Sequence, residues 1–263
     1  MGFDVKNTTK FSLLDLVFPF TCRGCGRLGS LLCGRCKKYN IEAMPEICPR
    51  CRKNLKKCRC EAPVVACAYR DGVMVQLVED FKYKSVRKTA EVLAELLTVA
   101  VGGRDGDRGG DGSGDGDGNV MKRNDIVRRD GIVRADESVA IVPLPTIAKH
   151  VRERGFDHTL LIARKMARKW PEAKVCRVLE RRGQTVQVGA DKEVRKRQAI
   201  EAYAVSERGA VEINELVRRC PEQQFLLIDD VWTTGASMEA AIRVMREAGA
   251  QKIAAAVVLM PRG

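Results

Sequence analysis

The chain has 263 residues, enough to bury a sizeable core, and its 45% hydrophobic and 31% charged residues exclude a generally disordered protein. Lysine and arginine number 47 against 34 aspartate and glutamate residues, so the formal net charge is +13. An excess of this size favours polyanionic partners, either phosphorylated ligands or nucleic acid, although a plain basic surface would give the same count.

The apolar stretch 11–20 near the N-terminus resembles a signal peptide at first sight. However, Asp15 interrupts it, Pro19 lies near its end, and no small-residue cleavage site follows. No uncharged apolar run approaches the ~20 residues that a membrane-spanning helix needs. The sequence therefore predicts a short docking helix that ends before Pro19, no membrane span, and a cytoplasmic location.

Cysteines are concentrated at the front of the chain, where nine of the 11 lie before residue 68. A Cys-x-x-Cys turn places two sulfurs on one edge of a tetrahedron, and two such turns complete a four-cysteine zinc site. The odd total and the paired spacing argue against a disulfide framework. Sequential pairing gives two structural Zn²⁺ sites, and a cross-braced pairing would use the same residues: Cys22, Cys25, Cys33 and Cys36, then Cys48, Cys51, Cys58 and Cys60.

After this module, which we place at 1–62, the pattern predicts a strand at 64–70 and helices at 73–82 and 86–101. Residues 102–118 hold nine glycines, five aspartates and no apolar residue, which predicts a flexible loop within an insertion at 102–137. Part of this loop fits a calcium-binding register, but Lys122 stands where such a loop needs a glutamate. A linker is therefore the favoured interpretation.

From residue 139 onward, apolar strands alternate with amphipathic helices. This alternation predicts an α/β fold, in which helices flank a parallel sheet, as a domain over 63–263. Asp157 is the expected N-cap of the first of these helices. The predicted strands are 139–144, 175–179, 225–229 and 253–260, and the predicted helices are 158–169 and 237–248.

The clearest chemical signal is the segment 225–237, where a buried strand leads into two carboxylates and a Thr-Thr-Gly loop that opens a helix. Open α/β folds bind ligands at this carboxyl edge of the sheet. The loop amides and the helix start favour an anion, and Gly235 lets a phosphate approach the backbone. Asp229 and Asp230 would repel a phosphate and suit sugar hydroxyls or a metal ion. A sugar with a 5′-phosphate and vicinal hydroxyls satisfies both demands.

This segment resembles the phosphoribosyl-pyrophosphate (PRPP) motif of type I phosphoribosyltransferases. The order of the remaining motifs is similar to that of the ComF family, competence-associated proteins with an N-terminal double zinc ribbon and a type I phosphoribosyltransferase-like fold. The motifs that carry this resemblance are Phe81-Lys82-Tyr83, Val142-Pro143-Leu144-Pro145, Arg152 to His158, and Gln187 with Arg195, Gln198 and Tyr203.

The resemblance implies a role for each residue of the site. Asp229 and Asp230 would hold the ribose hydroxyls, and Mg²⁺ would bind together with PRPP. Arg152 and Arg154 would bind the leaving pyrophosphate, so Asp229, Asp230 and Arg154 are the expected catalytic residues. The 5′-phosphate would lie against Thr233, Thr234, Gly235, Ala236 and Ser237.

Three other features are less determined by the resemblance. Residues 181–198 resemble a loop that closes over PRPP and excludes water. His158 would face either the pyrophosphate or solvent. Lys82 and Tyr83 match the family in type, although packing at a helix end would explain them equally well.

The sequence leaves three functions open. The first is a phosphoribosyltransferase with an unknown acceptor, and the second is a PRPP-binding protein without turnover. The third is an accessory protein that handles single-stranded DNA with the DNA-uptake machinery, although two tryptophans and four tyrosines offer little for base stacking. The motifs favour the first of these.

Overall fold

The computed structural model describes residues 20–39, 47–69, 72–101, 138–182 and 202–261, and the structural statements below concern these residues. The predicted docking helix, the insertion at 102–137 and the predicted closing loop from residue 183 onward lie outside them. Within the described part of the chain, no helix is long and apolar enough to cross a membrane.

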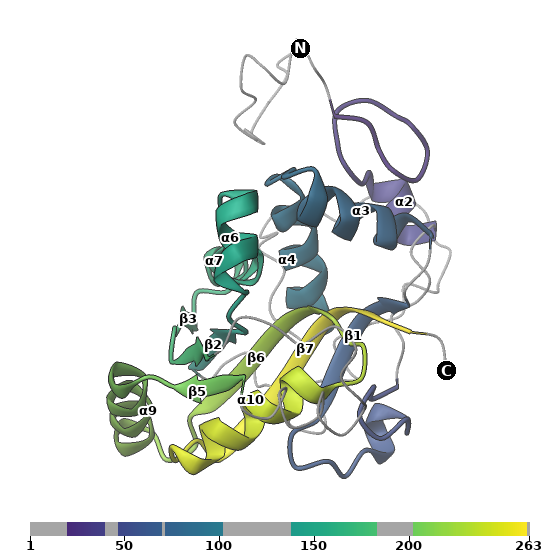
Figure 1. Ribbon diagram of the computed structural model, residues 1–263. Coiled ribbons are helices and arrows are strands. Elements are labelled where there is room, and N and C mark those ends of the chain that lie inside the picture. The colour runs from purple at the N-terminus through teal and green to yellow at the C-terminus, as the bar shows by residue number, and fades with distance from the viewer. Residues whose placement is uncertain (1–19, 40–46, 70–71, 102–137, 183–201, 262–263) are drawn as a thin grey trace, which may run out of the picture.

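A five-stranded sheet forms the centre of the molecule (Figure 1), and all neighbouring strands in it are parallel. This confirms the predicted α/β fold. The three internal strands of the sheet are almost wholly buried, which is why they read as continuous apolar runs in the sequence. The strand order is β1 (Val64–Tyr69), β7 (Lys252–Met260), β6 (Gln224–Val231), β2 (Val139–Pro143) and β3 (Ala173–Val175).

Helices cover both faces of this sheet. The helices α4 (Thr89–Ala100) and α7 (His158–Lys169) pack against each other and against strands of the sheet. The helix α10 (Ala236–Glu247) lies in front of the sheet in Figure 1 and connects β6 to β7. Right-handed crossovers require this division, because the chain moves across the sheet in opposite directions through α7 and through α10.

The predicted helices are confirmed to within a few residues, including α3 (Gly72–Tyr83). Asp157 caps α7 as expected, because its side chain accepts a hydrogen bond from the amide of Leu160 at 3.2 Å. Ile162, Met166 and Trp170 are buried beneath this helix, so the predicted inner face is also confirmed.

The prediction of a single strand over 175–179 is wrong. The edge strand β3 ends at Val175, and the chain then leaves the sheet to form β4 (Leu179–Arg181), which pairs antiparallel with β5 (Tyr203–Val205). Cys176 and Val178 are fully buried in the connection. The apolar run therefore reflects burial and not strand geometry.

Two helices of the α/β part were not predicted. The helix α6 (Ala148–Arg154) has no buried residue, and α9 (Glu207–Arg219) buries only Gly209 and Ile213, so neither has a full apolar face. A local signal for α9 was present, because the Ser206 side chain accepts a hydrogen bond from the Gly209 amide as an N-cap. The described residues of the cysteine-rich part add α2 (Gly34–Tyr39) and the short helix η1 (Leu55–Lys57).

Candidate functional site

Two carboxylates lie near the carboxyl end of β6. Asp230 is 4% exposed, and its amide donates a hydrogen bond of 2.8 Å to Oδ1 of Asp229. The Oδ2 atom of Asp230 lies 2.7 Å from Nζ of Lys82, the penultimate residue of α3, and 2.7 Å from Nε2 of His158, the first residue of α7. The acidic pair is therefore reached by two basic side chains from elsewhere in the chain.

The two carboxylates differ in their electrostatic surroundings. Burial and the neighbouring charge of Asp230 raise the pKa of Asp229 to about 7. Burial acts in the same direction on Asp230, but its contacts with His158 and Lys82 outweigh burial and lower the pKa of Asp230 below its ordinary value. The pKa shifts of the two carboxyls are therefore opposite in direction, and Asp230 ionises more readily than Asp229.

Polar groups around the start of α7 fix the imidazole ring of His158. Its Nδ1 atom lies 3.0 Å from Oγ1 of Thr146, and that hydroxyl donates to Oδ1 of Asp157 at 3.1 Å. A guanidinium nitrogen of Arg154 lies 3.3 Å from the same Nδ1 atom. The Arg154 guanidinium also lies over the ring of Tyr83, 5.8 Å from its centroid.

The loop after β6 turns at a glycine directly before the next helix. Gly235 adopts a left-handed conformation, with φ of 80°, and directly precedes α10. A Cβ atom at this position would lie 2.3 Å from the ring of Trp232, so only glycine fits. Thr233 and Thr234 are exposed, and Oγ1 of Thr234 accepts a hydrogen bond from the Ala236 amide at 3.4 Å.

Of the two arginines in the predicted site, the structure brings only Arg154 to the acidic pair, through its contact with His158. Arg152 is exposed on α6, and within the described residues no hydrogen bond or ion pair joins it to the site. His158 faces Asp230, which is neither of the two positions expected for it. Ser237 lies beside the hydroxyl of Tyr203.

Sequence analysis did not assign Lys82 or Thr146 to the site. Lys82 belongs to the Phe81-Lys82-Tyr83 motif, which was attributed equally well to packing, and Thr146 directly follows the Val142–Pro145 motif. Each of these motifs ends at the carboxyl edge of the sheet. That shared position is visible only in the folded chain, so the sequence alone did not identify either residue.

The cysteines form two clusters, and the structure groups them in the sequential way: Cys22, Cys25, Cys33 and Cys36, then Cys48, Cys51, Cys58 and Cys60. In each cluster the four sulfurs lie within 4.8 Å of one another. The Sγ atoms of Cys25 and Cys33 are 3.7 Å apart, as are those of Cys51 and Cys58. A tetrahedron with Zn–S bonds of ~2.3 Å has edges of about 3.8 Å, so both clusters are compatible with zinc.

His158, Asp229 and Asp230 form a third group with the spacing of metal ligands. This group differs from the cysteine clusters because a cation, the ammonium of Lys82, already contacts Oδ2 of Asp230. The acidic pair is thus better suited to hydroxyl groups of a ligand than to a metal ion held by the protein alone.

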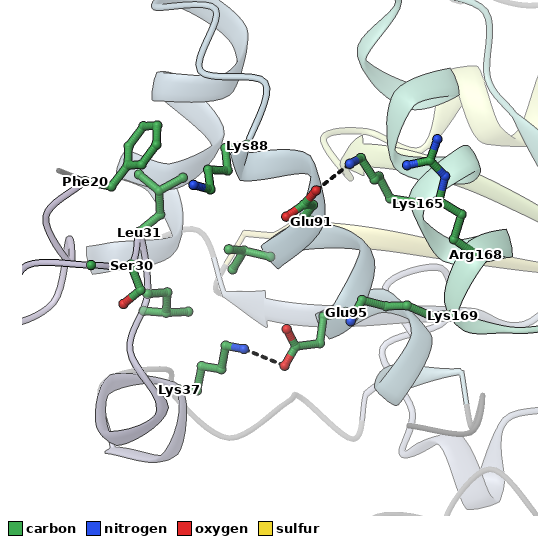
Figure 2. A pocket seen from close by; sticks show the side chains of 13 residues that line it. Phe20, Ser30, Leu31, Lys37, Lys88, Glu91, Glu95, Lys165, Arg168 and Lys169 are labelled. Carbon is green, nitrogen blue, oxygen red and sulfur yellow. Dashed lines mark hydrogen bonds and ion pairs between the residues drawn. The ribbon is translucent and has the colours of Figure 1, made fainter. Parts of the chain in front are cut away.

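A hollow of about 410 Å³ lies between the first cysteine cluster, α4 and α7 (Figure 2). Five basic and two acidic side chains line it. Lys37 pairs with Glu95 at 2.5 Å and Lys165 pairs with Glu91, so both acidic groups hold neighbouring elements together. None of the residues that line it belongs to the acidic pair or to the loop before α10. The hollow therefore lies between parts of the chain and is separate from the candidate site at β6.

In a comparison with family models, residues 160–262 match the phosphoribosyl transferase domain. The match begins inside α7 and includes the acidic pair and the Thr-Thr-Gly loop. A phosphoribosyl transferase domain therefore occupies the C-terminal part of the chain, whereas the cysteine clusters, α3 and β2 lie before it. Comparison with curated proteins gave no match to this chain.

Proposed function

We propose that the protein binds PRPP with Mg²⁺ at the carboxyl edge of the sheet and transfers its phosphoribosyl group to an acceptor. The observation that carries this proposal is the juxtaposition of the acidic pair with the loop at Gly235, inside a phosphoribosyl transferase domain. The loop and the start of α10 suit a 5′-phosphate, because backbone amides at a helix start attract anions. The carboxylates suit the ribose hydroxyls on the other side of the sugar.

Each residue then has a chemical role. Asp229 and Asp230 accept hydrogen bonds from the ribose hydroxyls, and residues Thr233 to Ser237 bind the 5′-phosphate. The bond from the anomeric carbon to pyrophosphate breaks as the acceptor attacks that carbon, and Arg154 stabilises the negative charge on the departing pyrophosphate. Mg²⁺, when bound, supplies further charge neutralisation. The two cysteine clusters would each hold one structural Zn²⁺.

A second candidate function is the handling of single-stranded DNA during DNA uptake. The motif order that resembles the ComF family and the net charge of +13 support it. Binding driven by charge alone should be weak and should fall steeply as the salt concentration rises. Sequence-specific binding that resists salt would contradict an interaction driven by charge alone.

Calorimetry with PRPP, with and without Mg²⁺, tests the first function. We expect binding that strengthens with Mg²⁺ and that weakens about 10- to 100-fold in Asp229→Asn, because a charged acceptor is lost. Gly235→Val should weaken it at least as much, since a side chain would collide with Trp232. Pyrophosphate release that depends on an acceptor identifies a transferase, and binding without release identifies a sensor. A folded, zinc-loaded protein that does not bind PRPP would rule out both.

Asp229→Asn also provides its own folding control. The raised pKa of Asp229 means that the folded protein holds this proton more tightly than the unfolded chain does. The wild-type carboxyl therefore destabilises the fold increasingly as pH rises from about 4 towards about 7. The asparagine variant should gain thermal stability at pH 8 relative to wild type, and gain less at pH 5. Lost affinity in this variant then cannot be attributed to unfolding.

A further inference from the structure

Asp230 is held by two basic side chains that come from outside its own strand. Nζ of Lys82 and Nε2 of His158 both lie 2.7 Å from its Oδ2 atom. The side chains of Lys82, His158 and Asp230 are 19%, 9% and 6% exposed, so water screens these contacts only weakly. Both of these contacts fall on the same carboxylate oxygen.

The orientation of His158 follows from the groups around its ring. A charged carboxylate can only accept a hydrogen bond, so Nε2 must carry the proton that points to Asp230. The opposite nitrogen, Nδ1, lies 3.0 Å from Oγ1 of Thr146 and 3.3 Å from a guanidinium nitrogen of Arg154, which can donate a hydrogen bond to it. The Phe81 ring lies against the imidazole at an angle of 78°, with centroids 6.3 Å apart. The ring is therefore fixed from three sides.

Lys82 is placed by the packing of α3 against the segment that leads into α7. The rings of Phe81 and Phe156 have centroids 5.3 Å apart, and Arg87 donates a hydrogen bond of 3.0 Å to the carbonyl of Gly155. Lys82 lies outside residues 160–262, so the matched domain does not include this contact with its own acidic pair.

We propose that Lys82 and His158 are positioning residues that reserve Asp230 for a sugar hydroxyl and keep metal ions away from the acidic pair. The proposal rests on the proposed ribose-phosphate ligand. His158, Asp229 and Asp230 have the spacing of metal ligands, but the Lys82 ammonium places a positive charge 2.7 Å from Oδ2 of Asp230, and this charge repels a metal ion. Mg²⁺ then enters only with the pyrophosphate of the ligand.

The first test needs no PRPP, and it uses the fact that the chain has only two histidines. In full-length, ¹⁵N-histidine-labelled protein, the Nε2–H signal of His158 should be protected from exchange and should move in Asp230→Asn. The exposed His150, which contacts Glu153, is the internal reference. Mn²⁺ alone, at millimolar concentration, should leave the His158 signal sharp. Selective broadening of that signal by Mn²⁺, or an unprotected Nε2–H, would overturn the proposal.

The second test measures Mg-PRPP affinity in Lys82 variants. Lys82→Met should weaken binding at least 10-fold, and Lys82→Arg should stay within about threefold of wild type because it keeps the cation. Lys84→Met is the matched control, since Lys84 lies two residues away and is 69% exposed; it should change affinity less than twofold. Equal affinity in wild type and Lys82→Met, or an arginine variant as weak as the methionine variant, would contradict the assignment. If wild type does not bind PRPP, the proposed function fails. The His158 signals would still show whether His158 donates to Asp230 and whether Mn²⁺ is kept away from the acidic pair.

Discussion

The two cysteine clusters are built on the same turn, yet they join the α/β part of the chain differently. In the first, the Gly26 amide donates to the Cys22 carbonyl at 2.8 Å, and in the second the Arg52 amide donates to the Cys48 carbonyl at the same distance. Both residues have a positive φ, of 72° and 61°. An isolated antiparallel bridge of the same span frames each turn, Thr21 with Leu28 and Ile47 with Asn54.

The difference lies in the arginine that each turn directs towards the α/β part. Arg23 pairs at 2.5 Å with Asp80, whose side chain is 2% exposed and which belongs to α3, the helix of Lys82. Arg50 pairs at 2.6 Å with Glu239, which is 39% exposed and lies in the first turn of α10. The first cluster thus supports the helix whose Lys82 contacts Asp230, and the second contacts the helix that follows the loop at Gly235.

Loss of one zinc should have the largest effect, because metal binding in such clusters is coupled to folding. We expect Cys36→Ser and Cys60→Ser each to reduce the zinc content from two ions per chain to one. The first should lower the thermal unfolding temperature more, since Cys36 is 1% exposed and its cluster anchors α3. The exposed Cys220 provides the control, and Cys220→Ser should change neither value. Metal analysis that returns no zinc in wild type would contradict the assignment of both clusters.

Removing the ion pair of the first cluster should also cost more stability than removing that of the second. Both losses should be smaller than the effect of losing a zinc ion. Arg23→Met leaves the buried Asp80 with Lys84 alone and should reduce the free energy of unfolding by about 1–3 kcal/mol, measured by urea titration. Arg50→Met removes a more exposed pair and should cost about 0–1 kcal/mol. Equal losses of free energy in the two variants would show that the burial of Asp80 does not make the ion pair of the first cluster stronger than that of the second.

This difference should also depend on pH. Burial raises the pKa of Asp80, but its contacts with Lys84 and Arg23 outweigh burial and lower the pKa below the ordinary value of 3.8. A lowered pKa in the folded state gives stability that is present above 3.8 and is lost as pH falls through the folded value. The difference in free energy of unfolding between wild type and Arg23→Met should therefore become smaller in strongly acidic solution.

The sequence predicted the parts of the molecule that depend on local pattern. Strands β2, β6 and β7 are continuous apolar runs, and the Thr-Thr-Gly loop is a short contiguous motif. The strands and the loop could therefore be recognised from the sequence alone. The meeting of Lys82, His158 and Asp230 could not be predicted, because it depends on how α3 packs beside α7. The grouping of the cysteines was likewise open until the fold separated one pair of turns from the other.

The smallest expected effect tests the turn that the two clusters share. A Cβ atom at Gly26 would meet nothing within 4 Å, so Gly26→Ala tests backbone strain alone and should destabilise the first cluster by about 1 kcal/mol. Arg52 already has this strained backbone conformation, and its side chain is exposed. Arg52→Gly should therefore stabilise the second cluster by about 0.5 kcal/mol. The gain is smaller than the strain that is relieved, because glycine makes the unfolded chain more flexible. Chelator titration of each variant measures the change as a shift in zinc affinity. Opposite shifts would establish that the two turns are equivalent and that the clusters differ only in how they are anchored, whereas shifts of the same sign would show that the turns themselves differ.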